Sequence, residues 1–146
     1  MARDTNVAYA SAARLLRLYR ERALSPVEVT RLLLDPLDIL QPKINAFCVV
    51  DRDGALSAAR ESEARWQRGE PIGRLDGVPV TIKDLVLMRG FPTLRGSLIV
   101  ERDQDWSEDA PATARLREAG ATIIGKTTTP ASVPVGRASI EQRWLH

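Results

Sequence analysis

Two short apolar segments with a helical segment between them constrain the fold of this chain more than any other feature. The first segment, residues 78–83, alternates apolar and other residues as a half-buried β-strand does. The second, residues 121–124, is a short apolar run that a glycine closes. A strand, a crossover that contains a helix and a second strand form the βαβ unit of a parallel sheet. The chain is therefore predicted to be an α/β protein, and Pro79 favours the start of a strand or a sheet edge.

The crossover between these strands divides into a loop and a helix. Residues 85–100 are interrupted by glycine and proline and predict a loop. Asp109 is the expected N-cap of the helix, Pro111 lies in its first turn, and Gly120 ends it. The order of elements is then strand, loop, helix and strand.

Helices are also predicted on the N-terminal side of the first strand. Residues 7–22 place apolar side chains at helical spacing and arginines largely off that stripe. A further helix extends from a cap at Asp51 or Asp53 through Trp66. Gly69 follows as a suitable C-terminal cap, because glycine adopts the left-handed conformation at low cost.

Between these two helices the pattern predicts a helix that is interrupted. Residues 25–28, Ser-Pro-Val-Glu, have the spacing of a capping box with proline at the first helical position. Pro36 is expected to break or kink this helix, and Asp35 is the candidate cap of a short second piece. Residues 44–50 are a compact apolar run that favours a strand.

Composition places the chain among globular proteins. It has 146 residues, of which 44% are hydrophobic and 27% charged, so one domain or an incomplete piece of one is expected. No apolar run approaches the roughly 20 residues of a membrane-spanning helix, and the polar N-terminus does not resemble a secretory signal. A membrane partner is therefore not expected.

Charge and the rare residues exclude several kinds of site. The net charge is +2, from 21 basic and 19 acidic residues, which makes a nucleic-acid partner unlikely. Cys48 is the single cysteine and His146 the single histidine, so an internal disulfide and a Cys/His zinc site are excluded. A histidine-based dyad would need His146 to reach a site from the last position. We expect no metal and no cofactor, and the lone thiol makes the cytoplasm the expected compartment.

Lysine is rare in this arginine-rich chain, and one lysine occupies an informative place. Lysines occur only at positions 43, 83 and 126, and Lys83 ends the first predicted strand, directly before Asp84. Open α/β sheets bind ligands at the carboxyl ends of their strands. Partial burial there would favour the neutral amine that can act as a base. A plain surface lysine is the alternative, and Asp84 either orients Lys83 or caps the following loop.

Other candidate positions have simpler interpretations. Gly96 and Ser97 present a hydroxyl or amides to a ligand, or form a plain turn. Residues 120–127 match the letters of a phosphate-binding loop, G-x-x-x-x-G-K-T, but their interior is the predicted strand, so this interpretation is rejected. The tryptophans are too scattered to form a stacking platform and are interpreted as packing residues: Trp66, Trp106 and Trp144.

Several of these segments, in this order and spacing, resemble the amidase signature family. Residues 73–84, Gly-Arg-Leu-Asp-Gly-Val-Pro-Val-Thr-Ile-Lys-Asp, carry the most specific part of the resemblance. The other matching segments are residues 25–28, 44–47, 90–93, 96–97, 109–110, 115–121 and 125–127. The resemblance extends from about the first predicted helix to Pro130.

The resemblance implies a fold and a reaction. The family has a mixed sheet flanked by helices and hydrolyses amides, or transfers the ammonia released, through a Ser–cis-Ser–Lys triad. By this resemblance Lys83 is the triad lysine, the base that acts on a bridging serine. The bridging serine in turn activates a nucleophilic serine that forms an acyl-enzyme. A small amide is the implied substrate of the full-length protein.

The sequence departs from the family in one decisive respect. Both triad serines lie in a Gly/Ser-rich stretch of the G-S-S-G-G type, and no such stretch occurs in these 146 residues. Residues 1–130 are therefore predicted to be the N-terminal part of an amidase domain, and residues 131–146 a tail that does not match. The abrupt change is typical of a frameshift or a fused foreign end. We expect an N-terminal fragment of a carbon–nitrogen hydrolase that is inactive by itself.

Two alternatives remain from the sequence. The chain is an interaction module that pairs with a separate chain or with an intact homologue. Otherwise it is a small basic nucleic-acid binder, which the scattered arginines do not favour. Co-purification with a partner distinguishes the first alternative, because an orphan fragment gains no stability from binding.

Overall fold

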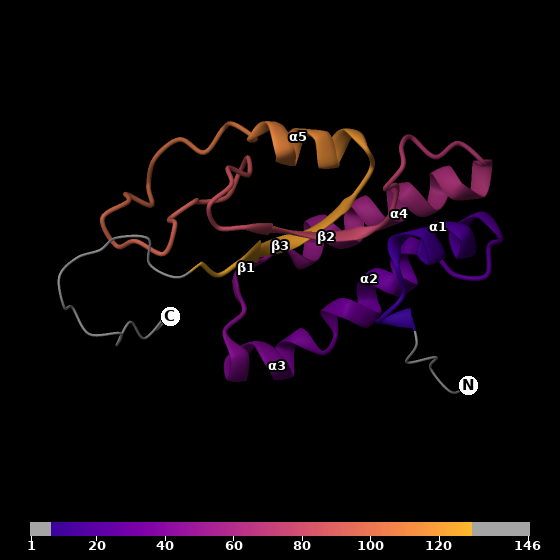
Figure 1. The fold of residues 1–146 in the computed structure, drawn as a ribbon, viewed down its shortest axis with the longest axis horizontal. Coiled ribbons are helices and arrows are strands. Elements are labelled where there is room, and N and C mark those ends of the chain that lie inside the picture. Colours follow the sequence, from indigo (N-terminus) through magenta and orange to yellow (C-terminus); the bar gives the residue numbers. More distant parts are fainter. Residues whose placement is uncertain (1–6, 130–146) are drawn as a thin grey trace.

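The computed structural model describes residues 7–129, which form a three-stranded sheet between helices (Figure 1). The helices are α1 (Ala12–Arg20), α2 (Pro26–Leu34), α3 (Leu37–Ile44), α4 (Arg52–Arg68) and α5 (Pro111–Glu118). The strands are β1 (Phe47–Val50), β2 (Pro79–Lys83) and β3 (Thr122–Thr127). The predicted 131–146 tail, with Trp144 and His146, lies outside the described residues. Within residues 7–129, no helix is long and apolar enough to cross a membrane.

The sheet is mixed, as predicted. Its strand order is β1-β3-β2, with β2 parallel and β1 antiparallel to β3. The βαβ prediction is confirmed, and Pro79 is both the first residue of β2 and part of an edge strand. The predicted end of the second strand at Gly125 is wrong, because β3 continues to Thr127. Gly125 instead permits the close approach of β1, since a Cβ there would lie 2.1 Å from the Val49 carbonyl oxygen.

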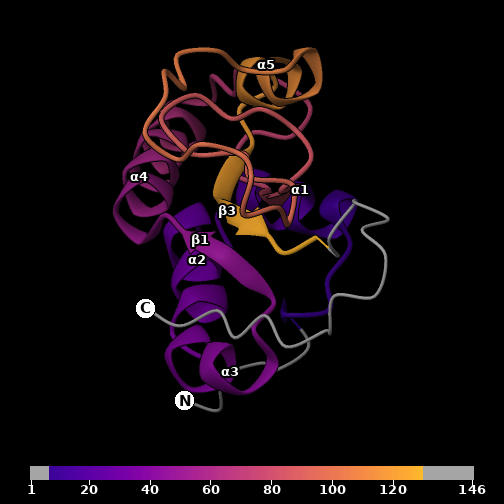
Figure 2. The same ribbon diagram turned by 90° about the vertical axis from the view of Figure 1, so that its left-hand side faces the viewer.

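The two faces of the sheet carry separate cores. Ile123 packs with Ile82 and Met88 on the face covered by α5 and the loop before it. The next residue, Ile124, points to the opposite face and packs with Leu34 of α2 and Ala55 of α4. Figure 2 shows α5 at one end of the molecule and α3 at the other. Burial on both faces explains why the consecutive residues Ile123 and Ile124 of β3 are both apolar.

The N-terminal helices pack around an aromatic pair. The rings of Tyr19 and Trp66 are tilted, with centroids 6.1 Å apart. The Tyr19 hydroxyl donates to the Gly77 carbonyl at 3.2 Å, and burial raises the pKa of Tyr19 above its ordinary value. Helix α1 begins five residues later than the predicted start at residue 7. The Ser11 hydroxyl accepts from the Arg14 amide at 3.3 Å and so caps the helix at that point.

Helix α2 has the predicted capping box, and the predicted break after it is confirmed. The Ser25 hydroxyl accepts from the Glu28 amide at 3.1 Å, and the Glu28 carboxylate accepts from the Ser25 amide at 2.8 Å. The prediction that Asp35 caps the next helix is wrong. Pro36 occupies the N-cap of α3 without a side-chain cap, and the Asp35 carboxylate lies 3.8 Å from the guanidinium of Arg52 instead.

Strand β1 begins later than predicted, because the first residues of the 44–50 run belong to α3 and its end. Gln41 of α3 also closes the outer edge of β1. Its side-chain amide donates to the Phe47 carbonyl and accepts from the Phe47 amide at 3.0 Å. After β1, the carboxylate of Asp51 caps α4 and Gly69 ends that helix in the left-handed conformation, as predicted.

Helix α5 lacks the predicted cap. Ala110 is its N-cap residue and provides no side-chain hydrogen bond. The carboxylate of Asp109 accepts from the Arg89 amide at 2.8 Å and pairs with Arg117 at 3.0 Å. Asp109 therefore joins α5 to the loop that follows β2. The proposal of Asp109 as N-cap is wrong because a carboxylate in a loop can serve a distant amide as well as a local one.

Candidate functional site

The Lys-Asp pair at the end of β2 places two charged side chains on opposite sides of the sheet. Successive residues of a strand point to opposite faces. Lys83 is exposed, whereas Asp84 is 3% exposed and lies under the following loop. Within residues 7–129, the Lys83 amine has neither an ion pair nor a hydrogen bond. The partial burial considered for Lys83 is not found within residues 7–129, where its side chain is exposed.

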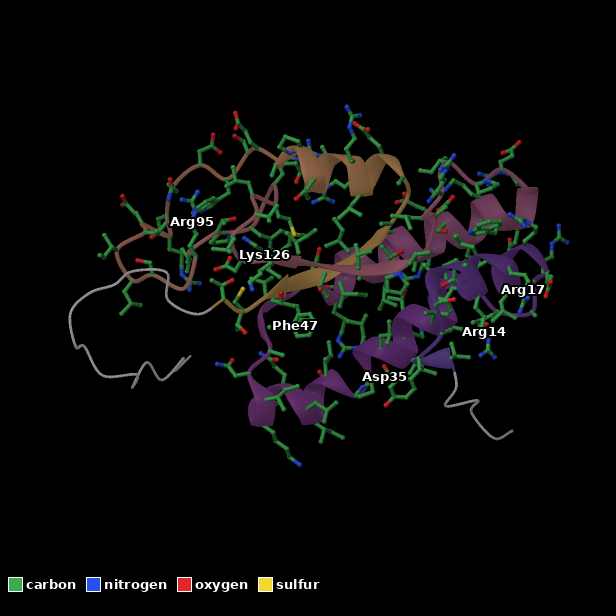
Figure 3. The ribbon with its side chains drawn as sticks, viewed as in Figure 1. Arg14, Arg17, Asp35, Phe47, Arg95 and Lys126 are labelled. Carbon is green, nitrogen blue, oxygen red and sulfur yellow. The ribbon has the colours of Figure 1, made fainter. Side chains whose placement is uncertain are left out.

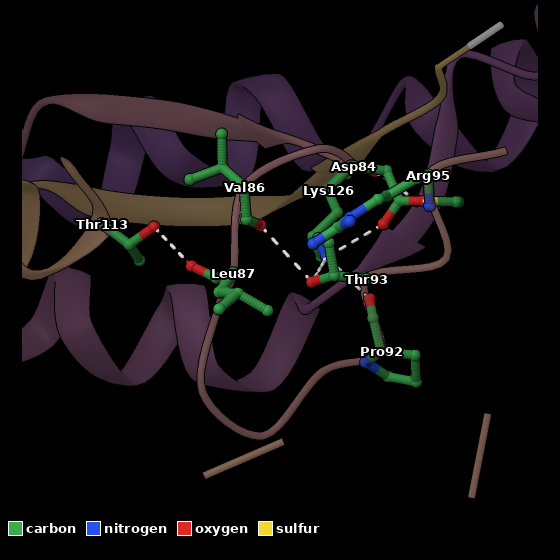
Figure 4. A network of polar contacts seen from close by, with 9 residues as sticks. Asp84, Val86, Leu87, Pro92, Thr93, Arg95, Thr113 and Lys126 are labelled. Atoms are coloured by element: carbon green, nitrogen blue, oxygen red, sulfur yellow. Dashed lines mark hydrogen bonds and ion pairs between the residues drawn. The ribbon is translucent and has the colours of Figure 1, made fainter. Parts of the chain in front are cut away.

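Asp84 is held by a second lysine, which comes from β3. Lys126 is fully buried, and its ammonium lies 2.9 Å from a carboxylate oxygen of Asp84. The same ammonium donates to the Pro92 carbonyl at 2.7 Å and to the Thr93 hydroxyl. The second carboxylate oxygen of Asp84 accepts from the Arg95 amide at 2.9 Å. Figure 4 shows this network, and Figure 3 shows Lys126 on the side of the sheet away from Phe47.

The network fixes the loop between β2 and α5 onto the sheet. The Thr93 hydroxyl donates to the Val86 carbonyl at 3.4 Å, which joins two segments of the loop (Figure 4). Farther along, the Thr113 hydroxyl of α5 donates to the Leu87 carbonyl at 2.7 Å. A buried ion pair with these additional hydrogen bonds has partners for most of its polar atoms. The turn directly after Lys83 is therefore held in one conformation.

Sequence reasoning missed the role of Lys126. The phosphate-loop interpretation of residues 120–127 was rejected correctly, because they form the turn after α5 and strand β3. The sequence feature that points to the role of Lys126 is a lysine at the end of an apolar run in an arginine-rich chain. Asp84 was considered either to orient Lys83 or to cap the following loop, and its contacts agree with the second role. Its carboxylate binds Arg95 and Lys126, not Lys83.

A cavity of about 570 Å³ lies beside Asp84, between β1 and the loop after Pro92. Cys48 lines it, and the Cys48 thiol donates to the Lys126 carbonyl at 3.4 Å. Burial and the negative charge of Asp84 raise the pKa of the Cys48 thiol, and the nearby Lys126 opposes them. A raised pKa reduces the fraction of Cys48 that is present as thiolate at neutral pH. Lys83 does not line this cavity.

The remaining candidates have these contacts in the described part of the chain. Gly96 and Ser97 lie in a turn in which the Ser97 hydroxyl accepts from the Ile99 amide at 3.2 Å, and Ser97 also lines the cavity beside Asp84. Trp66 is buried and its indole donates to the Asp76 carbonyl at 3.1 Å, which confirms packing. Trp106 is half-buried in the loop. Among residues 7–129, no group of three or more His, Cys, Asp or Glu side chains is placed to hold a metal ion.

The turn that leads into β2 is anchored by a second buried carboxylate. Asp76 accepts two hydrogen bonds from the Arg65 guanidinium, at 2.9 and 2.7 Å, and one from the Ile72 amide at 2.9 Å. Burial opposes ionisation of Asp76, but the contacts with Arg65 and Ile72 outweigh it and lower the pKa of Asp76 below its ordinary value. Gly77 follows with a φ of +79°, which glycine adopts without strain.

The lowered pKa of Asp76 predicts how the free energy of unfolding depends on pH. Because the folded-state pKa of Asp76 lies below the unfolded value, its contribution is complete above the unfolded pKa and is lost as pH falls. We expect the difference in free energy of unfolding between wild type and Asp76→Asn to be largest at neutral pH. The difference should narrow below about pH 4. Urea unfolding at several pH values measures it. The exposed control Asp103→Asn should show no such change, and an equal change in both would contradict the assignment.

Known proteins with similar sequences cover this chain but are much longer. A family model described as Amidase matches residues 28–139. The A subunit of the glutamyl-tRNA(Gln) amidotransferase from Salinispora tropica is 42% identical over 125 residues, which are 84% of this chain and 25% of that protein. Its counterpart from Acidothermus cellulolyticus is 43% identical over 119 residues, covering 80% of this chain and 23% of that protein.

Solved structures agree with the sequence matches. A bacterial aryl acylamidase of the amidase signature enzymes family superposes with a TM-score of 0.78 at 27% identity, covering 87% of this chain and 26% of that one. A peptide amidase from Stenotrophomonas maltophilia superposes with a TM-score of 0.73 at 28% identity, covering 81% of this chain and 24% of that one. The chain thus spans about a quarter of the length of the proteins it matches.

Proposed function

Because the chain belongs to the amidase family, we propose that it supplies the N-terminal part of a carbon–nitrogen hydrolase and is inactive by itself. In the complete enzyme the substrate is a small amide. A serine oxygen bonds to its carbonyl carbon and the C–N bond breaks, so the acyl group stays on the serine and the amine leaves with the proton that the serine gave up. The compartment we propose is the cytoplasm, as the single thiol suggests.

We propose that Lys83 is the base of that reaction. The observation that carries this role is its position: Lys83 ends β2 beside an anchored Asp84, and its amine is directed to the uncovered face with no partner in the described chain. A lysine acts as a base in its neutral form, which burial favours. The segment that provides the serines would also cover Lys83. The same segment would then bury the base and supply the nucleophile.

The inactivity of the isolated chain is tested directly. The purified chain should release no ammonia or aniline from simple amides and anilides above a buffer blank, because it has a base without a nucleophile or oxyanion donors. Turnover that disappears in Lys83→Ala and persists in Lys43→Ala would overturn the proposal. Lys43 is the matched control, since it is an exposed lysine on α3.

The role of Lys83 is tested in a covalent chimera. This chain replaces the corresponding N-terminal quarter of the Salinispora tropica relative, and amide hydrolysis is assayed. Loss of a general base costs about 10²–10⁴-fold in rate, so Lys83→Ala in the chimera should lose at least about 10²-fold in kcat. Lys43→Ala should leave kcat unchanged. A chimera that is active but insensitive to Lys83→Ala would remove Lys83 from the mechanism.

A further inference from the structure

Lys83 is the first residue of a tight turn that its neighbours hold at several points. The turn spans residues 83–86 and is closed by the Val86 amide, which donates to the Lys83 carbonyl at 2.9 Å. The second residue of the turn, Asp84, is fixed to β3 because its amide donates to the Thr127 carbonyl at 2.9 Å. The backbone on the carboxyl side of Lys83 is therefore set by the contacts of these neighbours.

The loop after the turn folds back and binds Asp84 in a strained conformation. The Arg95 amide donates to the Asp84 carbonyl at 3.1 Å and to its carboxylate at 2.9 Å. Arg95 has a φ of +58°, which is uncommon for a residue with a side chain and persists only where the surrounding structure imposes it. The loop is thus bent at Arg95 in a way that lets one amide bind Asp84 twice.

Thr93 joins the turn to the buried ion pair through a single hydroxyl. Thr93 is buried, and its hydroxyl accepts from the Lys126 ammonium and donates to the Val86 carbonyl at 3.4 Å (Figure 4). Lys126 in turn lies 2.9 Å from the Asp84 carboxylate. The backbone of the turn connects Asp84 to Val86, so the contacts form a closed ring. Its members are Lys126, Asp84, Val86 and Thr93.

We infer that Thr93 is a positioning residue for the base that we propose at Lys83, and that it acts through this ring. The lysine side chain is long, so a small rotation of its backbone moves the amine by a larger distance. A displacement of about 1 Å from the productive geometry can cost about 10²-fold in rate. Loosening the ring would therefore slow proton transfer without removing the base. The inference rests on the proposed function, since it assigns the group that orients the same base.

Hydrogen exchange in the full chain tests whether Thr93 holds the turn. Thr93→Val replaces the hydroxyl with a methyl group of similar size, so the Val86 amide should exchange at least about tenfold faster. Thr93→Ser keeps the hydroxyl and should leave that amide as protected as in wild type. The Thr122 amide, which donates to the Val78 carbonyl at 2.9 Å, reports opening of the whole fold. Its rate should change less than the rate of Val86.

Thr113→Val is the matched control for Thr93→Val. The Thr113 hydroxyl also donates to a carbonyl of the same loop, that of Leu87 at 2.7 Å, and Thr113 is similarly buried. Its loss should lower stability but leave the Val86 amide protected, because the Thr113 hydroxyl is not a member of the ring. An unchanged Val86 amide in Thr93→Val, or equal acceleration in Thr113→Val, would overturn the inference.

The covalent chimera tests the consequence for catalysis. Thr93→Val in the chimera should lower kcat at least about tenfold with KM nearly unchanged. Thr93→Ser should recover most of that kcat, and Thr113→Val should keep it, whereas a merely structural role would lower kcat in Thr113→Val as well. A chimera that loses kcat in Lys83→Ala but not in Thr93→Val refutes the positioning role alone. A chimera that is active but insensitive to Lys83→Ala refutes the proposed base, and the inference with it.

Discussion

Replacing Lys126 with methionine is expected to cost about 3–5 kcal/mol of the free energy of unfolding, because it leaves the Asp84 carboxylate buried without its counter-charge. Methionine has a similar length and fills the space of the lysine stem. The change also removes the donor to the Pro92 carbonyl and the Thr93 hydroxyl. The total free energy of unfolding of a domain is about 5–15 kcal/mol, so the variant should be largely unfolded in mild urea.

Two comparisons identify the cause of that loss. Lys43→Met changes an exposed lysine and should stay within about 0.5 kcal/mol of wild type. Asp84→Asn combined with Lys126→Met removes both charges and should be less destabilised than the sum of the two single variants. Equal losses for Lys126→Met and Lys43→Met, or strict additivity in the double variant, would show that the ion pair does not stabilise the fold. Urea unfolding followed by tryptophan fluorescence measures wild type, the three single variants and the double variant.

Replacing Gly125 with alanine is the second change with a large expected effect. The added Cβ would lie 2.1 Å from the Val49 carbonyl oxygen and 3.0 Å from two further backbone atoms of β1. Backbone atoms of a paired strand cannot rotate away as the end of a side chain can. Overpacking of this kind costs about 1–3 kcal/mol, and the φ of +155° adds strain for a residue with a side chain. We expect a loss of at least about 2 kcal/mol in thermal or urea unfolding.

Gly90→Ala is the matched control for Gly125→Ala. Gly90 has a φ of +85°, but a Cβ there would meet no atom within 4 Å. Its substitution therefore reports the conformational cost alone, about 1–2 kcal/mol. The clash predicts that Gly125→Ala is the more destabilised of the two, and that hydrogen exchange accelerates at the β1–β3 contact. An equal cost at both positions would mean that β1 moves aside without penalty.

Local sequence patterns predicted most of the elements of this fold. The capping box at Ser25, the break at Pro36 and the cap at Asp51 were predicted because each depends on residues within one helical turn. The parallel pairing of β2 and β3 was predictable because a strand, a helix and a strand have one common arrangement. Predictions failed where a side chain found a distant partner. Asp35 and Asp109 bind arginines and an amide elsewhere rather than capping the next helix.

The features of the candidate site also divide into those that local sequence predicts and those that tertiary contacts set. The sequence by itself determined the α/β class, the place of Lys83 at a strand end and the resemblance to amidases, because these depend on neighbouring residues and their spacing. Only the tertiary structure decided that Lys126 is the partner of Asp84 and that Gln41 closes one sheet edge. It also decided that, within residues 7–129, Lys83 is exposed and β2 is an edge strand. These facts depend on which surfaces meet when strands and loops far apart in the sequence pack together.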